Sequence, residues 1–261
     1  MRRIRARFQY PSADIVTKNP TLDRTLDRAI RQITRRKSPF PTSHHLSSFD
    51  VAVLGYPRSG NTFLIGWLQY VTAEQLRVLD GRLTHSAIDL MTMDKAGLST
   101  LIPARNPLDT IASLMVRANQ HQSAAFARDA LRSFEAWYAV AGKLLGRPTI
   151  SVVSFETIST DLRPVASMFS SSNVLADRAN AGNEPAKAWL EEKVKNEAGQ
   201  GLALEGVPAS QMVSLPRQER RHTNGDAKEI LAQADLSAEL TSAEETFDNF
   251  MVRSRALSKC L

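Results

Sequence analysis

The sequence predicts an α/β fold: a doubly wound, three-layer α/β/α domain with a central parallel sheet and a P-loop-like phosphate-binding loop. Short, continuously apolar runs at residues 50–54 and 149–153 have the length and composition of strands buried on both faces. A longer segment at 123–145 carries apolar residues at helical spacing and is expected to cover the sheet. Strands that alternate with helices imply right-handed βαβ units, which place ligands at the carboxyl ends of the strands.

Residues 49–69 are the unit around which the rest of the chain is organised. The apolar run 50–54 predicts a buried strand that ends at Gly55. A tight turn follows, and Asn61-Thr62 can open a helix with apolar residues at helical spacing. Such a unit presents backbone N–H groups and the positive end of a helix dipole at one place, so an anionic ligand is expected there.

The nucleotide-binding template G-x-x-x-x-G-K-[ST] almost fits from Gly55 to Thr62. Asn61 stands where the template has its lysine, and the cation, Arg58, lies earlier in the loop. A nucleoside triphosphate needs a cation at the lysine position to reach its terminal phosphates. The mismatch argues against a nucleoside triphosphate as the ligand. A turn with a purely structural role is an alternative to any phosphate-binding site.

A second segment of interest follows the apolar residues 98–104, which predict a strand interrupted by Pro103. Pro107 is placed to start a helix that carries Ile111, Leu114 and Met115 on its apolar side. Arg105, at the end of the strand, could offer paired donors to a phosphate. The alternative is a helix capped by Asn106 beside a solvated arginine.

The segment Y-P-R-S-G-N-T-F resembles the loop by which sulfotransferases hold the 5′ end of 3′-phosphoadenosine 5′-phosphosulfate. Arg58 stands where that family has its basic residue, and Asn61 where it has a small polar one. The resemblance implies that the cofactor is bound by Pro57, Arg58, Ser59, Gly60, Asn61, Thr62 and Phe63.

The segment after residue 104 is similar to the family's 3′-phosphate motif, R-[ND]-P-x-D-x-x-x-S, in which the arginine and the serine grip the 3′-phosphate. Arg105 and Ser113 occupy those two places. Thr84-His85 resembles the family's K-T-H, whose histidine is the catalytic base. Leu83 replaces the lysine, so a second cation must come from elsewhere, with Arg82 and Arg58 as candidates. Three carboxylates are alternatives to His85 as the base: Asp80, Asp89 and Asp94.

Two further matches are partial. Residues 220–228 resemble R-K-G-x-x-G-D-W-K, with His222 in place of the first glycine and Ala227 in place of the tryptophan. Arg220 and Arg221 could close over the 3′-phosphate, or the segment could be a solvated basic turn. Phe155-Glu156 resembles the family's Y-E-[DN], which implies that Phe155 binds the cofactor near its adenine. The resemblance therefore runs from about residue 49 to residue 228.

The expected function is that of a sulfotransferase, which transfers a sulfonate from 3′-phosphoadenosine 5′-phosphosulfate to a hydroxyl of a carbohydrate, lipid or small molecule. His85 and Arg58 are the expected catalytic residues, and no metal is expected to take part. Two alternatives remain: a P-loop nucleotide or small-molecule kinase, which would need Mg²⁺ and a lysine, and a noncatalytic nucleotide-binding protein on the same fold.

Length and composition fit one soluble domain of 261 residues, in which a cofactor-binding core at 49–228 lies between a helical extension at 1–48 and helices at 229–261. The net charge of +6 and pI near 9.7 favour anionic partners. With only 7% aromatic residues, nucleic acid ranks low among them. Peripheral contact with an anionic membrane remains an alternative for the basic N-terminal region. The N-terminus lacks the apolar core of a secretion signal, so a cytoplasmic location is expected.

The remaining segments give coarser expectations. Residues 22–33 predict a helix with a basic face, and 76–79 a short strand. The other expectations are a helix or loop at 88–91, a loop at 170–182, a helix at 185–198, an irregular segment at 199–216 and helices over 231–257.

Overall fold

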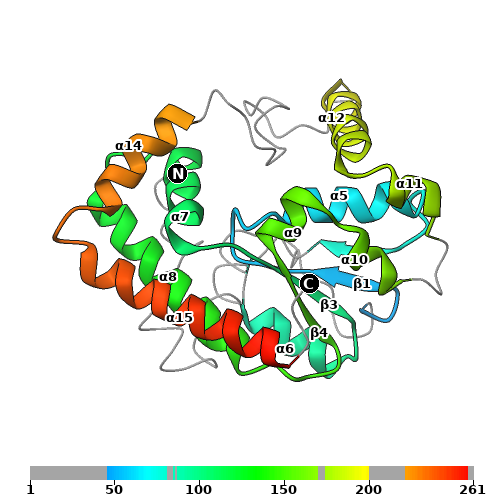
Figure 1. Ribbon diagram of the computed structural model, residues 1–261, viewed down its shortest axis with the longest axis horizontal. Helices are drawn as coiled ribbons and strands as arrows, with labels where there is room; N and C mark the ends of the chain where they lie inside the picture. Colours follow the sequence, from blue (N-terminus) through cyan, green and yellow to red (C-terminus); the bar gives the residue numbers. More distant parts are fainter. Residues whose placement is uncertain (1–45, 81–84, 86, 170–173, 200–220, 258–261) are drawn as a thin grey trace, which may run out of the picture.

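The computed structural model describes residues 46–80, 85, 87–169, 174–199 and 221–257. Its centre is a four-stranded sheet in the order β2-β1-β3-β4, with every neighbouring pair parallel. The strands are β1 (Val51–Val53), β2 (Val78–Asp80), β3 (Thr100–Ala104) and β4 (Ile150–Ser154). Helices surround the sheet (Figure 1). The expected α/β class with a parallel sheet is confirmed.

Helices connect the strands and continue after the last of them. Those before β4 are α5 (Asn61–Val71), α6 (Ala87–Lys95), α7 (Pro107–Arg117) and α8 (Ala124–Gly142). Those after β4 are α9 (Phe155–Thr160), α10 (Arg163–Ser167), α11 (Ala176–Asn180), α12 (Asn183–Gly199), α14 (Arg221–Leu231) and α15 (Ser237–Ala256).

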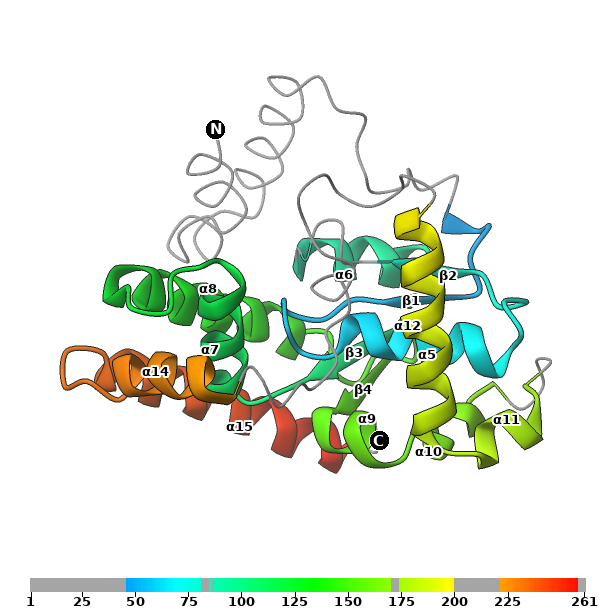
Figure 2. The same cartoon turned by 90° about the horizontal axis from the view of Figure 1, so that it is seen from above.

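Alternate residues of each strand enter two different hydrophobic clusters, as the two-residue repeat of a strand requires. Val51 and Val53 of β1 pack with residues of α5 and α9–α12. Ala52 of the same strand packs with residues of α6, α7, α8, α14 and α15. Figures 1 and 2 show these two groups of helices on opposite sides of the sheet. Both faces of the sheet are therefore buried, which explains why the strands are apolar without interruption.

The order in which strands are added to the sheet reverses after β2. The chain passes from β1 to β2 on one side of β1, and then crosses back to place β3 on the other side. In parallel α/β sheets, the carboxyl ends of two strands at such a switch point leave a crevice that binds ligands. The loop after β1 and the residues after β3 both lie at this edge, because the pairing of Ala52 with Thr100 aligns the two strands in parallel.

Pro103 stands in an interior strand, where proline is unusual because it cannot donate a ladder hydrogen bond. The carbonyls of Ser99 and Leu101 accept from the amides of Ala52 and Leu54, so the nitrogen of Pro103 faces the same neighbouring segment. By then β1 has ended at Val53, and no donor is required there. The proline thus marks the point at which β1 and β3 part.

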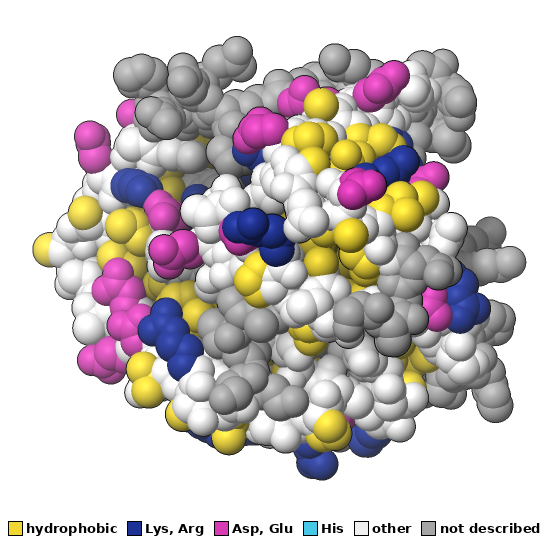
Figure 3. Space-filling view, turned by 45° about the vertical axis from the view of Figure 1, so that its right-hand side comes forward, with side chains coloured by type: hydrophobic (Ala, Val, Ile, Leu, Met, Phe, Trp, Pro, Cys, Tyr) yellow, Lys and Arg dark blue, Asp and Glu magenta, His cyan; other side chains and the backbone are white. Residues whose placement is uncertain are grey.

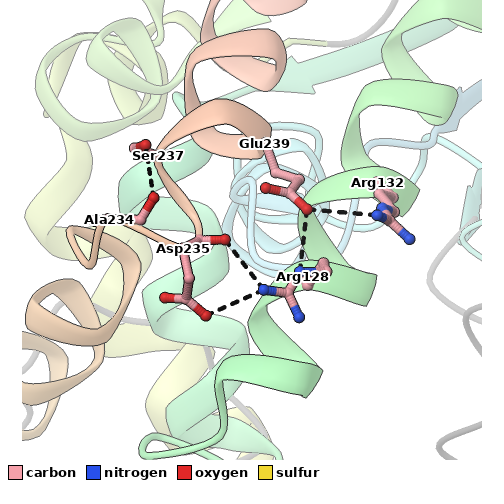
Figure 4. Close-up of polar contacts among 6 residues, drawn as sticks. All are labelled: Arg128, Arg132, Ala234, Asp235, Ser237 and Glu239. Atoms are coloured by element: carbon pink, nitrogen blue, oxygen red, sulfur yellow. Dashed lines mark hydrogen bonds and ion pairs between the residues drawn. The ribbon is translucent and has the colours of Figure 1, made fainter.

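Salt bridges join the last helix to the rest of this side of the molecule (Figure 4). Arg128 of α8 donates to Glu239 Oε1 of α15 and to Asp235 Oδ2, both at 3.1 Å. Arg132 donates to the same Glu239 oxygen at 3.4 Å. These pairs are partly exposed, so burial of Phe250 and Met251 against the core contributes more to the docking of α15 than they do.

The expected helices at 123–145, 185–198 and 231–257 are confirmed; α15 forms most of the last range, and α14 ends at its first residue. Residues 88–91 lie in α6, which decides between the two expectations for them. The loop expected at 170–182 is wrong for its second half, which holds α11. The helix expected at 22–33 and most of the irregular segment at 199–216 lie outside the described residues. None of the helices that the structure describes is long and apolar enough to cross a bilayer.

Gly55 admits no side chain. A Cβ there would lie 2.6 Å from both the Pro103 carbonyl oxygen and Ser59 Oγ, closer than real Cβ contacts allow. We expect Gly55→Ala to lower the free energy of unfolding by about 3 kcal/mol, because the backbone of β3 must move. The matched control is Gly225→Ala in α14, where a Cβ meets nothing within 4 Å. It should stabilise the protein by up to about 1 kcal/mol, since alanine favours helix. Urea titration of both variants measures their free energies of unfolding. Equal changes in the two variants would contradict the conclusion that Gly55 admits no side chain.

Candidate anion-binding site at the switch point

The loop between β1 and α5 is tightly folded. The Ser59 amide donates to the Tyr56 carbonyl at 3.2 Å, which closes a turn. Within the loop, Arg58 has φ 72° and Gly60 has φ 108°, and the second value suits only glycine well. The first bond of α5 runs from the Leu64 amide to the Gly60 carbonyl, so the amides of residues 60–63 precede the helical ladder. The first turn of α5 has no acidic residue, and the positive end of its dipole is left uncompensated by charge in that turn.

Asn61 holds the loop in shape. Its side-chain oxygen accepts from the Gly55 amide at 2.6 Å. Its side-chain nitrogen donates to the Tyr56 carbonyl at 3.0 Å and to Ser59 Oγ at 3.2 Å. The side chain is 3% exposed and turned inward. A lysine could not replace these paired donor and acceptor bonds, which gives a physical reason for asparagine at this position of the template.

The expected loop residues therefore differ in what they offer. Ser59 and Asn61 are buried, and their side chains bond within the loop. Phe63 is buried in the core on the α5 side of the sheet, and Pro57 is also buried. Thr62 and Arg58 are half-buried. An anion at this loop would meet backbone amides and the Arg58 side chain, because the other side chains, apart from that of Thr62, are directed into the protein.

Arg58 reaches across to the helix that follows β3. Its Nε donates to Ser113 Oγ at 3.0 Å. Ser113 lies in α7 and is 8% exposed. Since the serine oxygen accepts this bond, its own hydroxyl proton can be donated to another group. Two residues expected at opposite ends of a ligand, Arg58 and Ser113, are thus in direct contact.

Arg105 joins the same group from the end of β3. Its Nη1 donates to the Arg58 carbonyl at 3.4 Å, while its Nε is buried without a hydrogen-bond partner. Burial lowers the pKa of Arg105, and the nearby Asp109 carboxylate partly opposes this effect. The described residues include no carboxylate in an ion pair with it. A buried guanidinium N–H without a hydrogen-bond partner is costly, and an anion would satisfy it. Arg105 is half-buried rather than fully solvated, and Asn106 caps α7 as the alternative interpretation expects.

Phe155 lies beside Arg105 as a result of strand register. Ala104 of β3 pairs with Ser154 of β4, so the next residues, Arg105 and Phe155, leave the two strands side by side. The Arg105 Cζ lies 4.2 Å from the centroid of the Phe155 ring. Phe155 is the first residue of α9, which Ser154 caps by accepting from the Thr157 amide at 3.1 Å.

His85 lies against the strand end on the other side of the loop. Its Nδ1 is 3.0 Å from the Gly55 carbonyl oxygen. A carbonyl can only accept, which assigns the proton of the neutral ring to Nδ1 and the lone pair to Nε2. The Trp137 indole donates to the His85 carbonyl at 3.1 Å. These contacts hold a backbone at φ 50°, an uncommon value outside glycine that is often found at functional sites.

The segment expected to close over the ligand is only partly described. Arg220 lies outside the described residues, and Arg221 begins α14, with its side chain not described. The solvated basic turn is wrong for the described residues of this segment, which are helical. Ala227 is fully buried. Lys228 forms an ion pair with Asp109 of α7 at 2.5 Å, which ties α14 to the helix that begins next to Arg105.

Asp109 itself is held as a carboxylate. Burial raises its pKa, but hydrogen bonds from Lys228 and Asn106 and the charge of Arg105 together lower it below its usual value. Nothing in the local sequence pairs Asp109 with Lys228, which are 119 positions apart. The contact could have been suspected only from the positions of both residues within the two matched motifs.

The alternative bases occupy different places. Asp94 accepts from Thr149 Oγ1 at 2.6 Å, just before β4, so it lies at the amino edge of the sheet and away from the loop. Asp80 ends β2 and Asp89 lies in the first turn of α6. Arg82 and Leu83 lie outside the described residues. Among described residues, no three His, Cys, Asp or Glu side chains gather as a metal site would require.

The charge of the described surface is mixed. On the face drawn in Figure 3, Lys and Arg side chains lie singly or in small groups near Asp and Glu rather than in one continuous basic area. A broad electrostatic footprint for nucleic acid is not seen on that face.

Comparison with known proteins adds no relative. No protein-family model, no curated protein and no solved structure matches the chain.

Proposed function

We propose that the protein is a sulfotransferase, which transfers a sulfonate from 3′-phosphoadenosine 5′-phosphosulfate to a hydroxyl of a carbohydrate, lipid or small molecule. The observation that carries the proposal is the meeting of Arg58, Ser113 and Arg105 at one edge of the sheet, beside the start of α5. We assign the fold, on the same grounds, to the doubly wound three-layer α/β/α class with a P-loop-like loop.

The group fits a ligand with two phosphates. The amides before α5 and the Arg58 side chain supply one anion site. Arg105, with its orphaned Nε, and the hydroxyl proton of Ser113 supply a second. The two sites share Arg58, whose side chain bonds Ser113 and whose carbonyl accepts from Arg105. A nucleotide with phosphates on both the 5′ and 3′ carbons of its ribose carries two anions that could fill these two neighbouring sites.

His85 would supply the base. With the proton of the neutral ring on Nδ1, Nε2 can accept the proton of the acceptor hydroxyl as that oxygen attacks sulfur. A new S–O bond forms to the acceptor, the S–O bond to the 5′-phosphate breaks, and the electron pair remains on the phosphate oxygen. Arg58 and the loop amides would stabilise the charge that grows there. Arg58 and Arg82 are the two candidates for a second cation at the sulfonate, and of these the structure describes only Arg58.

The competing proposal is a P-loop kinase, with a noncatalytic nucleotide-binding protein as the third. A kinase would need a lysine at position 61, where the Asn61 side chain instead bonds within the loop. A noncatalytic protein would bind the same nucleotide without using His85.

Calorimetry with 3′,5′-adenosine bisphosphate and with ATP separates these proposals. A sulfotransferase should bind the bisphosphate at least about 100-fold more tightly than ATP, with no effect of EDTA, because two built anion sites are filled only by the former. Incubation of ³⁵S-labelled donor with a mixed pool of sugars, lipids and phenols then tests transfer by mass spectrometry. Tighter binding of Mg²⁺–ATP would favour the kinase, and binding without transfer to any acceptor would favour the noncatalytic protein.

A further inference from the structure

The Phe155 ring supports the Arg105 guanidinium. The ring centroid lies 4.2 Å from Arg105 Cζ, within the range of a cation–π contact. The position follows from the backbone, because the pairing of Ala104 with Ser154 sets the two residues side by side. The contact is therefore built into the sheet register rather than made by a surface side chain that happens to turn that way.

Arg105 has little else to orient it. Within the described residues, its one side-chain hydrogen bond, to the Arg58 carbonyl, is long at 3.4 Å, and its Nε has no partner. No carboxylate in the described parts of the chain pairs with it. An arginine side chain has many rotamers, and a guanidinium must be fixed in its plane to give paired hydrogen bonds to a phosphate. A ring whose centroid lies 4.2 Å from Cζ limits the orientations that the guanidinium can take.

Phe155 also contacts the first loop. A Cβ built on Gly60 would lie 3.5 Å from Phe155 Cδ2, so one edge of the ring faces the glycine that precedes α5. The ring thus lies between the loop and Arg105. The ring face toward Arg105 is covered by the guanidinium and is not open to an adenine base.

We propose that Phe155 is a positioning residue for Arg105, which sets the preference for a nucleotide that carries a 3′-phosphate, and that it is not the platform for the base. This inference rests on the proposed function. It separates two roles that the sequence could not distinguish. A base platform would strengthen binding of every adenine nucleotide, whereas support of Arg105 strengthens binding only of nucleotides with a 3′-phosphate.

The test compares two ligands that differ only in the 3′-phosphate, 3′,5′-adenosine bisphosphate and 5′-AMP, by isothermal titration calorimetry. Phe155→Leu keeps an apolar side chain but removes the ring face. We expect it to weaken bisphosphate binding by roughly three- to thirtyfold, the usual range for a cation–π contact, and to leave 5′-AMP binding unchanged. Phe155→Tyr keeps the ring and should restore the ratio of the two affinities.

A double-mutant cycle isolates the pair. In an Arg105→Lys background, Phe155→Leu should change the affinity ratio much less than in wild type, since the planar group is already gone. If the leucine variant does not fold, trifluorophenylalanine at position 155 keeps the shape and weakens the charge of the ring face. It should lower the ratio in the same direction.

The outcomes separate the two proposals. Equal weakening of both ligands by Phe155→Leu would overturn the positioning role and support a base platform. An unchanged ratio would overturn it as well, with the proposed function intact. A wild-type protein that does not distinguish the bisphosphate from 5′-AMP would overturn the proposed function and this inference together.

Discussion

Replacement of His85 by glutamine is expected to lower the turnover number for sulfonate transfer by about 10²- to 10⁴-fold, the usual contribution of a general base. Glutamine can keep a donor near the Gly55 carbonyl, which lies 3.0 Å from His85 Nδ1, but it cannot accept a proton at neutral pH. The affinity for 3′,5′-adenosine bisphosphate should change little, because the phosphate contacts are made by other residues. Single-turnover kinetics with labelled donor measure the first quantity, and calorimetry the second.

His121→Gln is the matched control. His121 lies in the loop after α7, whose first residue is near the site. The helix ends four residues, about 6 Å, beyond Ser113, and His121 itself belongs to none of the motifs assigned to the site. The control should keep wild-type turnover. Equal turnover in His85→Gln and wild type would exclude His85 as the base and leave Asp80 and Asp89 to be tested, since Asp94 lies at the other edge.

Replacement of Arg105 by lysine is expected to weaken binding of 3′,5′-adenosine bisphosphate by about 10²-fold, and to leave binding of 5′-AMP within about threefold of wild type. Lysine keeps the charge but loses the planar pair of donors, and hydrogen bonds to charged groups contribute about 1.5–3 kcal/mol each. The Nε that is buried without a partner also disappears, so the folded protein should lose no stability. Calorimetry with both ligands, together with thermal unfolding, measures the three effects.

Arg163→Lys serves as its control. That arginine pairs with Asp161 on the surface after α9, and 61% of its side chain is exposed. Its replacement should leave both affinities unchanged. If Arg105→Lys weakens the two nucleotides to the same extent, Arg105 does not read the 3′-phosphate, and the two-phosphate model of the site fails.

Much of the fold could be predicted because it depends on local patterns. The run at 50–54 is apolar at every position that β1 buries, and Asn106-Pro107 gives both the cap and the first residue of α7. The helix at 176–180 was missed because it is five residues long, a length at which periodicity carries no signal. The start of α14 was missed for another reason. Residues 221–225 are polar, and what identifies the helix is the burial of Ala227 against distant segments.

The candidate site was predicted in part. Its proposed members, among them Arg58, Arg105, Ser113 and His85, came from the resemblance of short motifs, and each lies in a segment after a strand or in the helix that follows it. Their mutual contacts were not predictable. The Arg58–Ser113 hydrogen bond joins residues 55 positions apart, and the inward turn of Asn61 depends on the backbone of the loop. The assignment of the His85 proton likewise required the position of the Gly55 carbonyl.

The sequence by itself determined which segments are strands and helices, and which polar residues stand at the ends of the strands, because hydrophobic period and turn chemistry act over a few neighbouring residues. Tertiary structure alone decided that β3 returns beside β1, so that the loop after Leu54 and the guanidinium of Arg105 meet. Strand order and side-chain contacts depend on packing between segments far apart in the chain, and no local pattern records them.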